Sequence, residues 1–192
     1  MLPTIVAYLL IGCFLVLQRA MRQGEQAKSL RPEQYDRGST RLIGQAFFVA
    51  ILALIAAPPI LNAFQIGRLC KDIVIGWAGI ALMLVGLGLR TWANRTLGNF
   101  YTSTLRVTDR QWVVQQGPYK ILRHPGYSGV LLMWAGAGVA TANWITTAII
   151  ILMMAVSYRY RIISEESMLL AQFGKEYQTY RARTWKMLPF IY

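Results

Sequence analysis

The sequence contains a single histidine, His124, within the short motif Arg123-His124-Pro125-Gly126-Tyr127. Proline disfavours a helical conformation in the residue before it and is well tolerated in the first turn of a helix, so a helix is predicted to begin at Pro125. The free N–H groups of such a turn favour anionic groups such as carboxylates. The motif could therefore hold the carboxylate of a small ligand. The structural alternative is that His124 caps the helix while Arg123 binds lipid phosphates.

A second polar pair, Arg161 and Glu165, lies farther along the chain. Because the two residues are four positions apart, they share one face of a helix. They could form a surface ion pair that contributes little to stability, or they could line a polar cavity at a membrane boundary. An amphipathic stripe follows, formed by Leu169, Phe173, Tyr177 and Tyr180 and interrupted at Gly174. It could pack on the preceding loop, lie on the membrane interface or close over a cofactor.

Metal and disulfide chemistry have little support in this sequence. The only cysteines are Cys13 and Cys70, no Cys-x-x-Cys motif occurs, and one histidine cannot make a multi-histidine site. We therefore expect no metal among the site's components.

The composition indicates an integral membrane protein. Of 192 residues, 20 are Lys or Arg and 8 are Asp or Glu, so the formal net charge is +12; hydrophobic residues make up 55% and charged residues 15%. Soluble domains carry roughly 25% charged residues, so disordered and coiled-coil classes are excluded. The apolar residues form blocks with basic residues between them, which is typical of membrane proteins rather than nucleic-acid binders.

Five apolar stretches approach the roughly 20 residues that a membrane-spanning helix needs. The second ends near Pro58-Pro59, and the last two are separated by only three residues, which predicts a helical hairpin whose short arms could tilt or insert partially. The first is predicted to be a retained helix rather than a signal peptide. The stretches are 2–17, 42–61, 73–89, 128–140 and 144–158.

The basic residues predict the orientation of these spans. Eighteen of the twenty lie in three segments, 19–41, 90–124 and the tail from residue 159. Positive loops stay cytoplasmic, so the N-terminus is predicted outside and the C-terminus in the cytoplasm. We expect one all-α membrane domain over 1–192, with three helices in 1–90 and a loop, a helical hairpin and a C-terminal segment in 91–192. The loop before the fourth span and the tail then meet on the cytoplasmic side, in contact with membrane lipids.

The second half of the chain, residues 97–191, resembles the isoprenylcysteine carboxyl methyltransferases, and its Arg-His-Pro-x-Tyr element is shared with the related phospholipid N-methyltransferases. The motifs that carry the resemblance are Leu97-Gly98-Asn99, Gly117-x-Tyr119-x-x-x-Arg123-His124-Pro125-x-Tyr127-x-Gly129, Glu165-Glu166-x-x-Leu169-x-x-x-Phe173-Gly174-x-x-Tyr177-x-x-Tyr180 and Pro189-Phe190-Ile191.

The resemblance implies an S-adenosylmethionine pocket on the cytosolic side, formed by the loop before the fourth span and the C-terminal segment, and a lipophilic acceptor that enters from the bilayer. It implies that Arg161 lies on the acceptor side. The implied cofactor residues are Gln111, Trp112, Val113, Val114, Tyr119, His124, Pro125, Gly126, Tyr127 and Glu165.

Methyl transfer is an in-line displacement that needs alignment and exclusion of water more than acid and base groups. A carboxylate acceptor is already ionised near pH 7, and Arg161 could hold it with a bidentate clamp, so the carboxylate of a prenylcysteine-like molecule is the expected acceptor. An amine acceptor must be deprotonated, which places phospholipid or other lipid-amine N-methylation second. A nicotinamide-dependent, sterol-reductase-like enzyme and a small transporter or scaffold are the remaining alternatives, and the sequence does not indicate the oligomeric state.

Overall fold

The computed structural model describes residues 2–20, 36–69, 72–101 and 112–189. Within these ranges the chain is helical and has no β-strand, as predicted. The long helices are α1 (Leu2–Ala20), α3 (Ser39–Ala63), α4 (Asp72–Leu97), α5 (Pro125–Ala140) and α6 (Trp144–Ala182), and two short 3-10 helices, η2 (Gly98–Phe100) and η3 (Gly117–Lys120), lie between α4 and α5.

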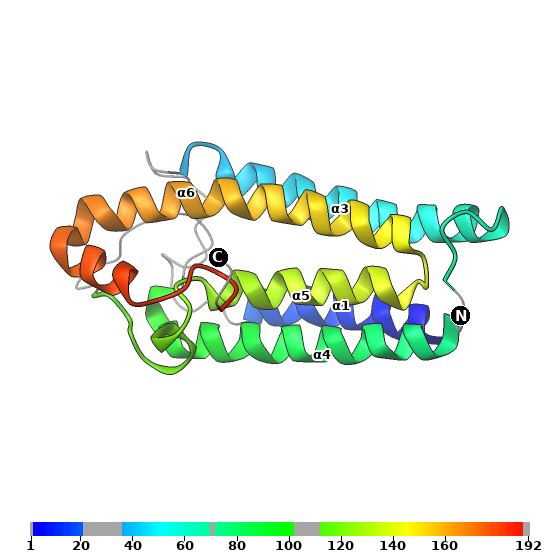
Figure 1. Ribbon diagram of the computed structural model, residues 1–192, viewed down its shortest axis with the longest axis horizontal. Coiled ribbons are helices and arrows are strands. Elements are labelled where there is room, and N and C mark those ends of the chain that lie inside the picture. Colours follow the sequence, from blue (N-terminus) through cyan, green and yellow to red (C-terminus); the bar gives the residue numbers. More distant parts are fainter. Residues whose placement is uncertain (1, 21–35, 70–71, 102–111, 190–192) are drawn as a thin grey trace.

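The helices form two layers that run along the same axis (Figure 1). Helices α3 and α6 lie side by side in one layer, while α5 packs on α4 and contacts α1 in the other. The core lies between the layers, where buried side chains from all five long helices meet; they include Phe14, Leu54, Met83, Trp134 and Ile150.

Glycines allow α4 and α5 to approach closely along their length. A Cβ atom added to Gly86 would lie 2.5 Å from the carbonyl oxygen of Gly129, and one added to Gly136 would lie 2.6 Å from the carbonyl oxygen of Gly79. Small residues at such positions are typical of helix pairs in membranes, because they let two backbones touch. This contact fixes the start of α5, which carries the histidine motif.

Four helices, α1, α3, α4 and α6, are long and apolar enough to cross a membrane. Helix α5 has 16 residues, eleven of them buried, and spans about 24 Å at about 1.5 Å per residue. It is thus shorter than the roughly 30 Å of a bilayer's hydrocarbon core. The chain is an integral membrane protein with the predicted set of five apolar helices, one of which is short and enclosed by the others.

Three helix ends differ from the sequence prediction. Helix α4 continues to Leu97 instead of ending at residue 89, so Arg90 lies within the helix. Helix α3 continues through Pro58 and Pro59 to Ala63 instead of ending at the prolines. Helix α6 has 39 residues and extends well past its apolar part, residues 144–158. The predicted interruption at Gly174 is confirmed: its φ of 51° and ψ of −120° are not helical, and the chain after it turns back toward the bundle (Figure 1).

Polar side chains join the connections at the opposite end of the bundle. The side chain of Asn143 caps α6 by accepting from the Thr146 N–H at 3.1 Å, and it donates to Asn62 Oδ1 and to the Ile66 carbonyl, both at 2.8 Å. The α3–α4 connection is thereby tied to the α5–α6 turn, which holds the two layers in register.

Candidate functional site

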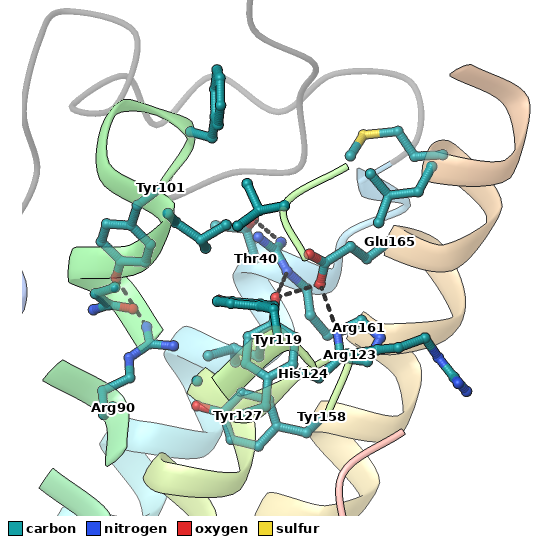
Figure 2. A pocket seen from close by; sticks show the side chains of 18 of the residues that line it. Thr40, Arg90, Tyr101, Tyr119, Arg123, His124, Tyr127, Tyr158, Arg161 and Glu165 are labelled. Atoms are coloured by element: carbon teal, nitrogen blue, oxygen red, sulfur yellow. Dashed lines mark hydrogen bonds and ion pairs between the residues drawn. The ribbon is translucent and has the colours of Figure 1, made fainter. Parts of the chain in front are cut away.

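A cavity of about 400 Å³ lies where the polar end of α6 meets the start of α5 (Figure 2). Its walls come from all five long helices, from η2 and from residues 112–124. Of the predicted site residues, Pro125 is buried in the first turn of α5 but does not line the cavity, and Gln111 lies outside the described residues. The predicted residues that line it are Trp112, Val113, Val114, Tyr119, His124, Gly126, Tyr127, Arg161 and Glu165.

The C-terminal segment 183–189 is bound to the histidine motif by backbone pairing. The His124 N–H donates to the Lys186 carbonyl at 3.0 Å, and the Ser128 hydroxyl donates to the Met187 carbonyl at 2.6 Å. The two segments therefore fold together, as the sequence analysis expected of the loop before the fourth span and the tail.

His124 lies between two carboxylates of α6. Its Nδ1 is 3.6 Å from Glu165 Oε2, and its Nε2 is 3.4 Å from Glu166 Oε1. Its ring stacks on that of Tyr127, with centroids 5.6 Å apart and planes 9° apart. The ring therefore contacts both glutamates, and this geometry suits a histidine that holds them in place.

Arg123 serves as an internal anchor, not as a lipid contact. Its Nε is 3.0 Å from Glu166 Oε1, its Nη1 donates to the carbonyls of Arg181 and Thr184, and its side chain is 8% exposed. Burial by itself raises the pKa of Glu166, but the hydrogen bond and charge of His124 and then those of Arg123 outweigh burial and lower it to about 2. Glu166, which the sequence analysis did not single out, thus fixes the tail to α6.

Tyr127 links the two predicted residues of α6 (Figure 2). Its hydroxyl donates to Glu165 Oε2 at 2.7 Å and accepts from Arg161 Nε at 3.3 Å. Arg161 and Glu165 therefore face the same cavity, as their spacing predicted, and α5 connects them.

The structure also supplies a partner for Arg161 that the sequence analysis missed. Arg161 Nη1 is 2.8 Å from Asp36 Oδ1 and donates to the hydroxyls of Ser39 and Thr40 at 2.9 and 2.8 Å. Burial raises the pKa of Asp36, but hydrogen bonds from Thr40, the charge of Arg161 and a hydrogen bond from Ser39 outweigh it and hold the pKa below its ordinary value. The available signal was an acidic residue shortly before Ser-Thr at a helix start.

Arg90 of α4 is a third residue that sequence reasoning missed, because it served there only as a topology charge. Its Nη2 donates to the Tyr101 hydroxyl at 2.9 Å and to Gln18 Oε1 at 3.3 Å. Its Nε is buried without a hydrogen-bond partner, and no carboxylate of the described residues forms an ion pair with it. Arg90 therefore brings to the cavity a positive charge that no described carboxylate neutralises.

The family described as phospholipid methyltransferase matches residues 74–176. The chain is similar to the probable protein-S-isoprenylcysteine O-methyltransferase of Oryza sativa subsp. indica, with 32% identity over 119 residues that cover 61% of this chain and 62% of the relative. It is also 32% identical over 116 residues to the protein-S-isoprenylcysteine O-methyltransferase of Rattus norvegicus, covering 59% of this chain and 41% of that protein. The matched part thus spans less than two thirds of either relative.

The fold is similar to a solved structure as well, that of the eukaryotic intramembrane Ras methyltransferase ICMT (isoprenylcysteine carboxyl methyltransferase) without a monobody. The TM-score is 0.73 at 20% identity, and the match covers 98% of this chain and 68% of the other. The resemblance to isoprenylcysteine methyltransferases that the motifs indicated is confirmed by these relatives. Because the family match covers more than half of its residues, the chain belongs to the phospholipid methyltransferase family.

Proposed function

We propose that the protein is a membrane methyltransferase that transfers a methyl group from S-adenosylmethionine to the carboxylate of a lipophilic, prenylcysteine-like acceptor. The observation that carries the proposal is one cavity in which a polar wall of three arginines, His124 and Glu165 meets an apolar wall inside a membrane bundle. The names of the similar proteins and the family membership support the same reaction class.

The residues at the polar wall fit this cofactor, which supplies an electrophilic methyl group on a sulfonium. The first turn of α5 would hold its carboxylate, His124 would keep Glu165 in position, and Glu165 would accept from its amine or ribose hydroxyls. Residues 112–114 and Tyr119 would contact the adenosine. Gly126 lets the Arg90 side chain pack against the first turn of α5, because a Cβ atom there would lie 2.7 Å from Arg90 Nη1.

The apolar wall fits the tail of a lipid-like acceptor. It includes Leu15 of α1 together with Ile43 and Phe47 of α3. An acceptor with an apolar tail and a polar head would enter sideways between helices, because its tail stays in the bilayer while its head meets the cofactor. Positive segments favour the cytoplasm, so the site would open on that side, with the N-terminus outside.

Two arginines would act on the acceptor carboxylate. Asp36 already neutralises Arg161, so Arg161 would orient the carboxylate while Arg90 supplies the neutralising charge. The carboxylate attacks as the ionised form that predominates near pH 7, and no general base is needed. The apolar wall would help to keep water away from the reacting groups.

Lipid-amine N-methylation is the second candidate, and the description of the matching family favours it. An amine must be neutral to attack and becomes a cation after methylation. Such a cation would form close to Arg90, whose charge no described carboxylate neutralises, and like charges repel. The charge distribution in the cavity therefore ranks the carboxylate first.

The test is a methyl-transfer screen on the purified full chain in lipid nanodiscs with radiolabelled S-adenosylmethionine. The acceptors are an N-acetyl-S-prenylcysteine, its carboxamide as the matched control, phosphatidylethanolamine and a quinol. We expect base-labile label on the prenylcysteine and none on the carboxamide. Base-stable label on phosphatidylethanolamine alone would instead establish the second candidate, and no transfer to any acceptor would refute both.

A further inference from the structure

Tyr177 reaches the cavity only because α6 is broken three residues before it. Gly174 has a φ of 51° and a ψ of −120°, a backbone conformation that residues with a Cβ atom rarely adopt. The segment after it turns back toward the bundle (Figure 1), so Tyr177 and Tyr180 both line the cavity. Their rings pack together with centroids 5.9 Å apart. Both tyrosines are therefore held in place by the fold.

The two hydroxyls differ in their hydrogen bonds. The Tyr180 hydroxyl donates to the Tyr119 carbonyl at 2.9 Å. The Tyr177 hydroxyl is buried in a side chain that is 2% exposed, and it has no hydrogen-bond partner among the described residues. An unsatisfied buried hydroxyl destabilises a fold, so one that lines a cavity indicates a ligand atom as its partner.

The surroundings of Tyr177 define the chemistry of that partner. Burial first, and then the negative charges of Glu166 and Glu165, raise the pKa of Tyr177, so its hydroxyl keeps a proton to donate. A ligand hydroxyl can accept from Tyr177 and at the same time donate to the Glu165 carboxylate, which also lines the cavity. An ammonium only donates, so it would leave the proton of the Tyr177 hydroxyl without an acceptor.

We propose that Tyr177 is a binding residue for the methyl donor, and that its hydroxyl donates to a ribose hydroxyl that in turn donates to Glu165. This inference rests on the proposed function. It assigns the ribose to the end of the cavity below the turned-back segment of α6, and the amino-acid part to the start of α5. The break at Gly174 would then serve ligand binding, because a straight helix would carry Tyr177 away from the cavity.

The test is calorimetric binding of S-adenosylhomocysteine and its 2′-deoxy and 3′-deoxy analogues to the full chain and to Tyr177→Phe. We expect Tyr177→Phe to bind S-adenosylhomocysteine about five- to tenfold more weakly, as for one lost hydrogen bond. For one of the two deoxy analogues, Tyr177→Phe and the wild type should have nearly equal affinities, because that analogue lacks the hydroxyl that accepts from Tyr177. Without ligand its melting temperature should be unchanged or higher, because the variant removes an unsatisfied group. The matched control Tyr180→Phe should instead melt lower, because it loses the bond to Tyr119.

The outcomes separate this inference from the function on which it rests. If the wild-type chain binds S-adenosylhomocysteine and Tyr177→Phe binds it equally well, the role of Tyr177 is wrong while the function stands. Equal losses on all three ligands, or a lower melting temperature of unliganded Tyr177→Phe, would also refute the hydrogen bond to ribose. If the wild-type chain binds none of the three ligands, both proposals fail.

Discussion

The ion pair between Asp36 and Arg161 connects the start of α3 to the polar end of α6, and Asp36→Asn tests its role. Asp36 is 1% exposed and Arg161 is 5% exposed, so removing the negative charge leaves a guanidinium buried without its counter-ion. Breaking a buried ion pair by removing one partner costs about 3–5 kcal/mol. Asparagine retains an oxygen that can accept from Thr40 and Ser39, so we expect about 3 kcal/mol, the lower end of this range.

The same variant should change ligand binding in opposite directions. The cavity gains one positive charge, which disfavours the cationic methyl donor and favours an anionic acceptor. Asp36→Asn should therefore raise the KM for S-adenosylmethionine and lower the KM for a prenylcysteine carboxylate. The carboxamide-bearing analogue, which carries no charge, is the control and should bind as it does to the wild type.

The assay is thermal unfolding in detergent with Asp36→Asn, Arg161→Gln and the double variant, together with methyl-transfer kinetics. Residues that form one ion pair are non-additive, so the double variant should be less destabilised than the two single effects combined by about 1–3 kcal/mol. Additive effects on stability, or KM values that both rise, would show that Asp36 does not neutralise Arg161 in the folded protein.

Three further predictions concern the tail, the helix contact and the acceptor's route. The pKa of Glu166 is about 2, below its ordinary 4.5, so its carboxylate contributes about 3 kcal/mol to the free energy of unfolding above pH 4.5, and this contribution is lost as the pH falls toward 2. Glu166→Gln should therefore melt lower at pH 7, and its melting temperature should fall less between pH 7 and acidic pH. A melting temperature that falls with pH as steeply as in the wild type would contradict this. Gly86→Ala should lower the free energy of unfolding by about 1–3 kcal/mol, because the added Cβ would lie 2.5 Å from α5 backbone atoms. In the same thermal assay the control Gly88→Ala should not be destabilised, because no atom lies within 4 Å of a Cβ added there. Gly44 lines the cavity with no atom within 4 Å of an added Cβ, so Gly44→Leu should raise the KM for long-chain acceptors and spare short ones, and equal KM changes for both would exclude entry beside α3.

Local patterns in the sequence determined the elements of this protein. Long apolar runs can only be buried in lipid or in one another, and they predicted the membrane helices. The constraint that Pro125 places on His124 predicted the start of α5, and Gly174 marked the break in α6, because both effects act within a few residues along the chain. The family resemblance rested on motifs in the same half of the chain.

Where α6 would end was beyond such patterns. Its polar half carries the stripe of Leu169, Phe173, Tyr177 and Tyr180, whose spacing indicated a helical face. That spacing did not show that this face continues α6 and lines the cavity, because such a contact depends on the packing of distant segments. Local rules likewise predict that α3 ends at Pro58 and Pro59, yet the helix continues through both prolines.

The partners in the site were decided by the tertiary structure alone. Asp36 and Arg161 are 125 positions apart. The sequence analysis counted Arg90 only among the topology charges of segment 90–124, yet it reaches the cavity from α4. Charge pairing depends on distance in space and on burial, and neither quantity is recorded in spacing along the chain. The sequence therefore determined which helices form and where the histidine motif lies, while the packing of α3, α4 and α6 around that motif decided which charges are neutralised and which face the cavity.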